Sequence, residues 1–227
     1  RSGKLVPAAA FFVPVFGRPP WFFEWAIVCV HGAATLAGMR VVLIAAQSLD
    51  GRITPYGQTE AAFVSEADRG WFPACLREFD CSVMGAATYR HNRATLQARM
   101  GRVARHRVVL TRDPAALAGD AIPGQLEFSS EAPDALLSRF ERGGLKHCAL
   151  LGGGEINALF LAAGVVDELW VTLEPCLLGA GQPLVAGQVR VALQLKETRP
   201  IGRDVLLMKY AVVRGVAPDA AGPLSGN

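Results

Sequence analysis

The chain has 227 residues, of which 51% are hydrophobic and 19% are charged, and its formal net charge is +3. This composition excludes an intrinsically disordered chain, and the small net charge gives no support to a protein that coats nucleic acid. The length suffices for one sizeable domain and is marginal for two. Five cysteines form no C-x-x-C pair, which favours reduced thiols, a cytoplasmic location and no metal site.

The first 38 residues combine bulky aromatic side chains with several prolines and lack a regular hydrophobic period. Their apolar run at residues 25–30 is too short to span a bilayer, so no membrane partner is expected. Regular patterning starts at Met39. We therefore expect residues 1–38 to be an atypical extension outside the core, and residues 39–213 to form the folded domain. Residues 214–227, rich in Gly, Ala and Pro, are typical of a disordered tail.

From Met39 onward, predicted strands alternate with predicted helices. The apolar run of residues 41–46 is typical of a strand buried on both faces. Residues 65–79 predict a helix capped by Ser65, with Pro73 expected to kink it or delay its start. Later segments alternate in the same way, with strands at residues 81–84, 107–110 and 146–151 and helices at residues 133–142 and 155–163. Strands without intervening helices follow at residues 168–173, 189–195 and 205–213. We therefore expect one α/β domain with a sheet that is mostly parallel at first and antiparallel at its C-terminal end.

Three glycines, Gly152, Gly153 and Gly154, separate a predicted strand from the helix that follows it. Glycines allow a ligand to approach the backbone closely, and the first N–H groups of a helix attract a phosphate. The favoured guest is therefore the phosphate of a nucleotide, and a plain tight turn is the alternative. Glu155 is expected to complement the positive end of the helix dipole rather than to act as an acid.

Two more strand ends carry residues suited to a ligand, since α/β sheets bind ligands at the carboxyl ends of their strands. Residues 46–53 end the first strand, and Ser48 and Asp50 lie there beside an Asp-Gly turn. Gly85 ends the second strand, and Thr88 offers a hydroxyl near the start of a helix or turn. An ordinary turn is the alternative at both places.

Thr111 and Arg112 follow the next strand and can grip a phosphate monoester, since arginine offers a bidentate fork and threonine adds a hydrogen bond. A ribose 2′-phosphate held in this way would discriminate NADP from NAD. Residues 81–112 contain seven arginines and no acid, which is typical of a solvated basic surface or of a lobe that receives a phosphorylated small molecule. A nucleic-acid partner is not expected, because Tyr89 is the one aromatic residue among these arginines.

Together these motifs resemble the reductase domain of bacterial riboflavin biosynthesis, the C-terminal domain of the bifunctional deaminase/reductase, in the dihydrofolate-reductase-like superfamily. The resemblance spans about residues 39–213. It rests on Ser48-Leu49-Asp50-Gly51-Arg52-Ile53, Val83-Met84-Gly85 with Thr88, Leu110-Thr111-Arg112, Gly152-Gly153-Gly154 with Asn157, and Gly164-Val165-Val166-Asp167-Glu168-Leu169. It implies a three-layer sandwich around a central mixed, mostly parallel sheet with an antiparallel C-terminal hairpin, an NADPH-dependent reductase, and a homodimer.

The resemblance also implies roles for single residues. Those expected to contact the cofactor are Ala46, Gly85, Thr88, Thr111, Arg112, Gly152, Gly153, Gly154, Glu155 and Ile156. Those expected to contact the substrate are Ser48, Asn92, Leu96 and Arg99, the arginine binding a ribose phosphate. Two acids that riboflavin reductases carry are absent here, because Asn92 and Gly152 occupy their positions. The substrate half of the motif therefore departs from the family pattern.

The sequence thus predicts an NADPH-dependent enzyme that transfers a hydride to a phosphoribosylamino-pyrimidine or a related heterocycle. Asp50 is the nearest candidate acid, and a structural role in its turn is the alternative. A dihydrofolate or pterin reductase is the second hypothesis. A third hypothesis, from another class, is an NADP-binding protein without catalysis.

Overall fold

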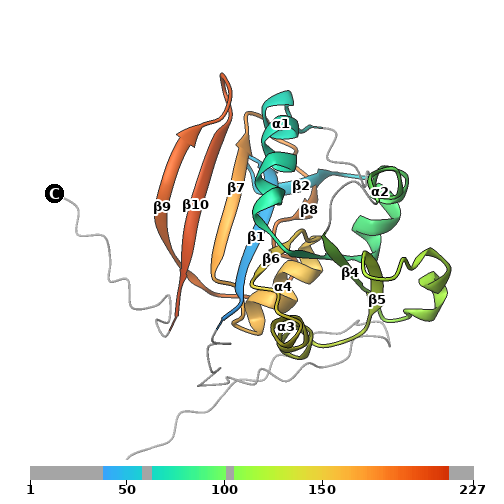
Figure 1. The fold of residues 1–227 in the computed structure, drawn as a ribbon. Helices are drawn as coiled ribbons and strands as arrows, with labels where there is room; N and C mark the ends of the chain where they lie inside the picture. Colours follow the sequence, from blue (N-terminus) through green and yellow to red (C-terminus); the bar gives the residue numbers. More distant parts are fainter. Residues whose placement is uncertain (1–37, 58–62, 101–104, 215–227) are drawn as a thin grey trace, which may run out of the picture. The chain divides into compact units, whose positions relative to one another are not determined.

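The computed structural model describes residues 38–57, 63–100 and 105–214, and every structural statement below refers to these. The expectations for residues 1–37 and 215–227 lie outside the described residues. Strands and helices alternate from β1 (Arg40–Ser48) to α4 (Gly154–Ala162), and the chain then continues in strands (Figure 1). The alternation confirms the expected α/β class.

Eight strands form one sheet in the order β5-β4-β3-β6-β1-β7-β10-β9. Their bounds, besides β1, are β3 (Cys81–Gly85), β4 (His106–Leu110), β5 (Leu126–Ser129), β6 (His147–Leu150), β7 (Glu168–Glu174), β9 (Ala192–Pro200) and β10 (Leu206–Val213). Neighbours from β5 to β7 pair in parallel, whereas β10 pairs antiparallel with both β7 and β9. A mostly parallel sheet with an antiparallel C-terminal edge is what the sequence predicted. Two short strands, β2 (Arg52–Pro55) and β8 (Gly181–Pro183), pair separately.

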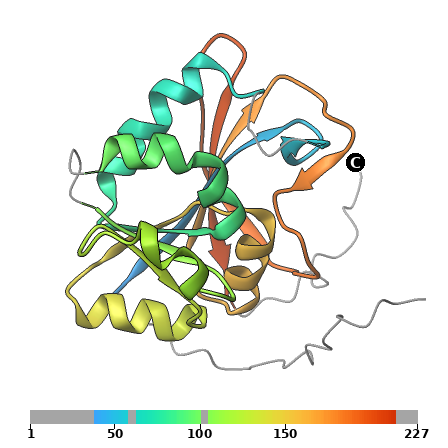
Figure 2. The ribbon, with the colours of Figure 1, turned by 90° about the vertical axis from the view of Figure 1, so that its right-hand side faces the viewer.

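Helices cover both faces of the sheet (Figure 2). On one face α1 (Glu66–Cys75) and α2 (Ala86–Arg99) pack on alternate residues of the strands, with Trp170 and Tyr89 in the buried clusters. On the other face α3 (Pro133–Arg142) and α4 pack through residues such as Phe140 and Phe160. Because β1 is covered on both faces, its apolar residues form a continuous run rather than an alternating pattern.

The structure corrects the element bounds at two places. α1 begins after its Ser65 cap as predicted, but it ends two residues beyond Pro73, and a 3-10 turn (Leu76–Glu78) continues the chain. Proline removes one helical hydrogen bond and crowds the preceding turn, which favours an early end. β9 lies several residues later than predicted, because its charged residues face solvent at the edge of the sheet and give no apolar pattern. The sequence pattern did not predict β5, because its four residues are too few to show a clear period.

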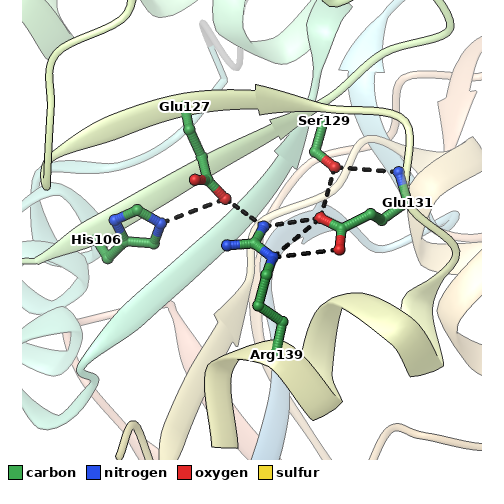
Figure 3. Close-up of polar contacts among 5 residues, drawn as sticks. All are labelled: His106, Glu127, Ser129, Glu131 and Arg139. Carbon is green, nitrogen blue, oxygen red and sulfur yellow. Dashed lines mark hydrogen bonds and ion pairs between the residues drawn. The ribbon is translucent and has the colours of Figure 1, made fainter. Parts of the chain in front are cut away.

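Arg139 joins α3 to the edge strand β5 (Figure 3). Its guanidinium contacts Glu127 on β5 and donates to Oε2 of Glu131 at 2.8 Å. Ser129 Oγ donates to the same Glu131 oxygen at 2.8 Å, and His106 Nε2 lies 3.4 Å from Glu127 Oε1. The hydrogen bond from Arg139 lowers the pKa of Glu131 against the opposing effect of burial. The network holds the helix on an edge strand that has one strand neighbour.

Candidate functional site

Two strand-to-helix turns meet at the carboxyl edge of the sheet. The N–H of Gly85, at the end of β3, donates to the carbonyl of Gly152, after β6, at 2.7 Å. Thr88 Oγ1 lies 3.6 Å from the position that a Cβ on Gly153 would take. The first turns of α2 and α4 are therefore side by side, and the sequence prediction that both glycine motifs serve one site gains a geometric basis.

Close packing explains the glycines of these turns. Gly152 has φ +79°, a conformation that L side chains rarely adopt. A Cβ on Gly85 would come within 2.8 Å of Ile156 Cγ1, and one on Gly154 within 2.5 Å of the Pro183 carbonyl. Glycine is thus required where α2 and α4 begin, because a side chain at Gly85 or Gly154 would collide with neighbouring residues.

Neither α2 nor α4 has a side chain that caps its first turn. Their N-caps are Gly85 and Gly153, so the first N–H groups keep their hydrogen-bonding capacity for a ligand. The positive ends of two helix dipoles also add at this point. Asn157 anchors the first turn of α4. Its Nδ2 donates to Leu184 O at 2.8 Å, and its backbone N–H donates to Gly153 O. The arrangement fits the two phosphates of a dinucleotide.

Arg112 provides a cation just after the end of β4. Arg112 is exposed and has no side-chain partner among the described residues. Thr111 is half-buried, and its Oγ1 accepts a hydrogen bond from the N–H of Asp113 at 3.2 Å. The hydroxyl of Thr111 also donates to the Asp113 carbonyl at 3.4 Å, so the guanidinium of Arg112 is the group here that is available to a phosphate monoester.

The order of the strands turns these separate motifs into one line. Gly85 ends β3 and Ala46 lies near the end of β1, whereas Arg112 follows β4 and Gly152 follows β6. These four strands are successive neighbours in the sheet. Strands are about 4.8 Å apart, so the line from β4 to β1 measures about 14 Å. An extended dinucleotide can bridge this distance, with its monoester phosphate at β4 and its far ring at β1.

Asp50 anchors a loop at the end of β1. Its carboxylate accepts hydrogen bonds from Ser48 Oγ at 2.6 Å, from the N–H of Leu178 at 3.0 Å and from the N–H of Gly179 at 2.7 Å. The bond from Ser48 is the main reason why the pKa of Asp50 falls to about 2. A carboxyl group with this pKa carries no proton at neutral pH, so the geometry favours the structural alternative for Asp50.

Two buried acids that the sequence analysis missed lie on the other side of β1. Asp68 on α1 accepts a hydrogen bond from Thr172 Oγ1 on β7 at 2.7 Å. Glu174 on β7 is 1% exposed, and its Oε1 accepts from Ser65 Oγ at 3.1 Å. The available signal was the polar pair of Thr172 and Glu174 at alternate positions of an otherwise apolar strand. Pairing of β1 with β7 places them opposite Ala46 and Ser48.

The predicted substrate residues on α2 are not brought to this edge. Asn92 is exposed and donates to the Thr88 carbonyl at 2.9 Å, while Leu96 packs into the core under α2. Arg99 ends the helix, thirteen residues after Ala86, and a rise of 1.5 Å per residue carries its backbone about 20 Å along the axis. The role of these residues in substrate binding stays a prediction from the sequence.

Within the described ranges, no three His, Cys, Asp or Glu side chains lie close enough to hold a metal ion. No helix of the same ranges is long and apolar enough to cross a membrane.

Comparisons with known proteins agree with this geometry. The sequence model of the RibD C-terminal domain family matches residues 39–207. No curated protein sequence matches the chain. RibD of Acinetobacter baumannii is similar in structure, with a TM-score of 0.65 and 18% identity over 78% of this chain, which spans 59% of that protein. The riboflavin biosynthesis reductase of Saccharomyces cerevisiae gives a TM-score of 0.56 at 14% identity, over 78% of this chain and 90% of that one.

Dihydrofolate reductase of Enterococcus faecalis, solved in complex with NADP(H), has a TM-score of 0.52 at 15% identity, over 76% of this chain and 96% of that one. At these identities the likeness shows a shared fold, and the expected dihydrofolate-reductase-like architecture is confirmed.

Proposed function

Because the chain belongs to the RibD C-terminal domain family, we propose that it is a reductase that uses NADPH to reduce a phosphoribosylamino-pyrimidine of riboflavin biosynthesis or a related nitrogen heterocycle. The observation that supports NADPH as the cofactor is the line of four strand ends from Arg112 to Ala46. Two helices begin in the middle of this line, and neither has a side chain that caps its N-terminus. The line offers a cation, two phosphate-binding turns and a ring position in the order in which NADPH presents its groups.

When bound, the cofactor would supply a hydride from its reduced nicotinamide. Thr111 and Arg112 would hold the 2′-phosphate, and the first turns of α2 and α4, with Thr88, would hold the pyrophosphate. The region of Ala46 at the end of β1 would then receive the nicotinamide. Glu155 and Ile156 would contribute their backbone N–H groups from the first turn of α4.

Arg112→Ala tests the assignment of NADPH. We expect this change to weaken NADPH binding about tenfold or more and to leave NADH binding unchanged, because a charge-assisted hydrogen bond to the 2′-phosphate is lost. Fluorescence titration of both nucleotides gives the two dissociation constants. Arg77→Ala removes an exposed arginine near the opposite end of the sheet and serves as the matched control. Equal affinity of Arg112→Ala and the unaltered protein for NADPH would refute the 2′-phosphate assignment.

Reduction of a pterin is the second candidate, and the buried acid Asp68 favours it. Asp68 contacts β7, which lies beside β1 on the side away from the glycine turns, and an acid there would hydrogen-bond the N–H groups of a heterocycle without any ribose phosphate. Oxidation of NADPH in the presence of each of a panel of riboflavin-pathway pyrimidines and pterins distinguishes the two candidate functions. Turnover of neither class, together with tight NADPH binding, would favour the non-catalytic alternative.

Three finer points stay predictions from the sequence: a phosphorylated substrate bound by Ser48, Asn92, Leu96 and Arg99, a homodimer, and a cytoplasmic location. Arg99→Ala tests the first, since it should raise KM for a phosphorylated substrate and spare cofactor binding.

A further inference from the structure

One side-chain contact joins two parts of the proposed cofactor site. The segment between β4 and β5, residues 111–125, contains Arg112 near its start and then runs through a 3-10 helix (Ala115–Asp120). We name this segment the β4–β5 connection. Asp120, the last residue of its 3-10 helix, is bound by α2, the helix whose first turn contains Thr88. A residue outside the proposed cofactor contacts therefore links the arginine for the 2′-phosphate to the turn for the pyrophosphate.

Two side chains of α2 hold Asp120. Tyr89, which follows Thr88 in the chain, is fully buried, and its hydroxyl donates to Asp120 Oδ2 at 2.9 Å. Arg93, one helical turn later, forms an ion pair with Asp120 Oδ1. Each oxygen of the carboxylate thus has its own donor, and the Asp120 side chain is only 11% exposed. Hydrogen bonds to an ionised group that is sheltered from water are stronger than those of an exposed ion pair.

The tyrosine is itself held in place. Its ring packs edge-to-face on Phe128 of β5, with the two ring centroids 5.1 Å apart. Burial raises the pKa of Tyr89, and the hydrogen bond to Asp120 raises it further, so the hydroxyl keeps its proton and stays a donor. The contact therefore fixes the end of the β4–β5 connection against both α2 and the edge strand.

Hydrogen bonds also hold the start of the connection, on both sides of Arg112. The N–H of Thr111 donates to the Ser129 carbonyl at 2.9 Å, and the N–H of Asp113 donates to Thr111 Oγ1 at 3.2 Å. Asp113 Oδ1 accepts from the N–H of Ala116 at 3.1 Å, in the first turn of the 3-10 helix. Arg112 is thus tied to the 3-10 helix, and its place relative to α2 depends on how that helix is held.

We propose that Asp120, bound by Tyr89 and Arg93, is a positioning residue that sets the spacing between Arg112 and the first turn of α2, and through it the preference of the site for NADPH over NADH. This inference rests on the proposed function. Both nucleotides carry the pyrophosphate, and only NADPH carries the 2′-phosphate. A hydrogen bond weakens steeply when its distance and angle are wrong, so a shifted connection costs NADPH affinity and leaves NADH affinity as it is.

Tyr89→Phe tests the proposal with little change in packing, because it removes the hydroxyl and keeps the ring on Phe128. We expect the dissociation constant of NADPH to rise about fivefold, the effect of one lost hydrogen bond, and that of NADH to stay unchanged. Asp120→Asn should act in the same direction, since it removes the charge that binds Arg93. Fluorescence titration of both nucleotides measures this. Tyr210→Phe is the matched control, because its hydroxyl contacts Met208 on β10, and it should change neither constant.

A double variant shows whether Tyr89 acts through Arg112. In the Arg112→Ala protein, Tyr89→Phe should weaken NADPH binding no further, because no guanidinium is left to position. A further fivefold loss in the double variant overturns the positioning role. An equal loss of NADPH and NADH affinity in Tyr89→Phe overturns it as well, since a general loosening of the fold gives that result.

Failure of this inference differs from failure of the proposed function. NADPH binding that survives Arg112→Ala unchanged refutes the 2′-phosphate assignment and the positioning role together. A loss in Arg112→Ala with no loss in Tyr89→Phe and Asp120→Asn refutes the role of Asp120 alone. Should Tyr89→Phe not fold, Arg93→Met removes the other partner of Asp120, whose side chain is 54% exposed, and should lower the preference for NADPH in the same direction.

Discussion

Asp50 and Asp68 show that the surroundings of a carboxyl group decide its chemistry. Asp50 accepts three hydrogen bonds and remains ionised, with its pKa lowered to about 2. Asp68 is buried near a second acid, and its pKa is raised. From the sequence, Asp50 was the nearest candidate acid because it lies in a recognisable turn. Burial, which no local pattern reveals, raises the pKa of one carboxyl group, whereas hydrogen bonds lower the pKa of the other.

Asp50→Asn tests the structural role of Asp50. The folded pKa lies below the ordinary value of 3.8, so the carboxylate stabilises the fold above that value and the benefit disappears as pH falls through about 2. We expect the variant to have a lower Tm than the unaltered protein at neutral pH, with a difference that shrinks in acid. Thermal unfolding over a pH series measures this. A Tm difference that does not vary with pH would contradict this structural role. If the decline of enzymatic activity at high pH disappeared in Asp50→Asn, Asp50 would again be the candidate proton donor.

At the scale of elements, α3 and β5 depend on the charged network around Arg139. The side chains of Arg139, Glu127 and Glu131 are 37%, 32% and 36% exposed, so water screens the pairs. Arg139→Met should therefore lower the free energy of unfolding by at most about 1 kcal/mol. Because the pKa of Glu131 is lowered in the fold, the contribution is present above the ordinary carboxyl range and is lost in acid.

Urea unfolding of Arg139→Met at neutral and acid pH measures this effect. Arg142→Met, an exposed arginine on the same helix, is the control and should change the free energy of unfolding less. A loss from Arg139→Met that is as large in acid as at neutral pH would mean that the guanidinium over the Phe140 ring, rather than its ion pairs with the two glutamates, carries the contribution.

At the scale of the whole molecule, the described residues close a core on both faces of the sheet. We predict that a chain of residues 38–214 folds with the Tm of the full chain and binds NADPH with the same affinity. Buried residues from β1 to β10 form the clusters, and the glycine turns, Arg112, Asp68 and Glu174 all lie within this range. Calorimetry and nucleotide titration of both chains make the comparison. A lower Tm or a weaker affinity of the shorter chain would show that the flanking residues contribute.

Local patterns were enough for the class of the fold and for the glycine turns at which we propose that phosphate binds. Alternating apolar runs predicted the parallel sheet, and glycines after strands predicted both turns, because backbone conformation and helix starts depend on neighbouring residues. Exposed or very short strands were shifted or missed: β9 carries charges toward solvent, and β5 has four residues. The substrate residues predicted on α2 rested on a family motif, and their role stays a prediction.

The sequence by itself determined the α/β class, the glycine turns and the Thr111-Arg112 pair, since each is written in consecutive residues. The tertiary structure alone decided how far apart these motifs lie, because the order β4-β3-β6-β1 differs from their order in the chain. It also decided that Asp68, Thr172 and Glu174 meet, about a hundred residues apart in sequence, on the face of the sheet under α1. Proximity of this kind follows from strand pairing and burial, which are properties of the whole folded domain.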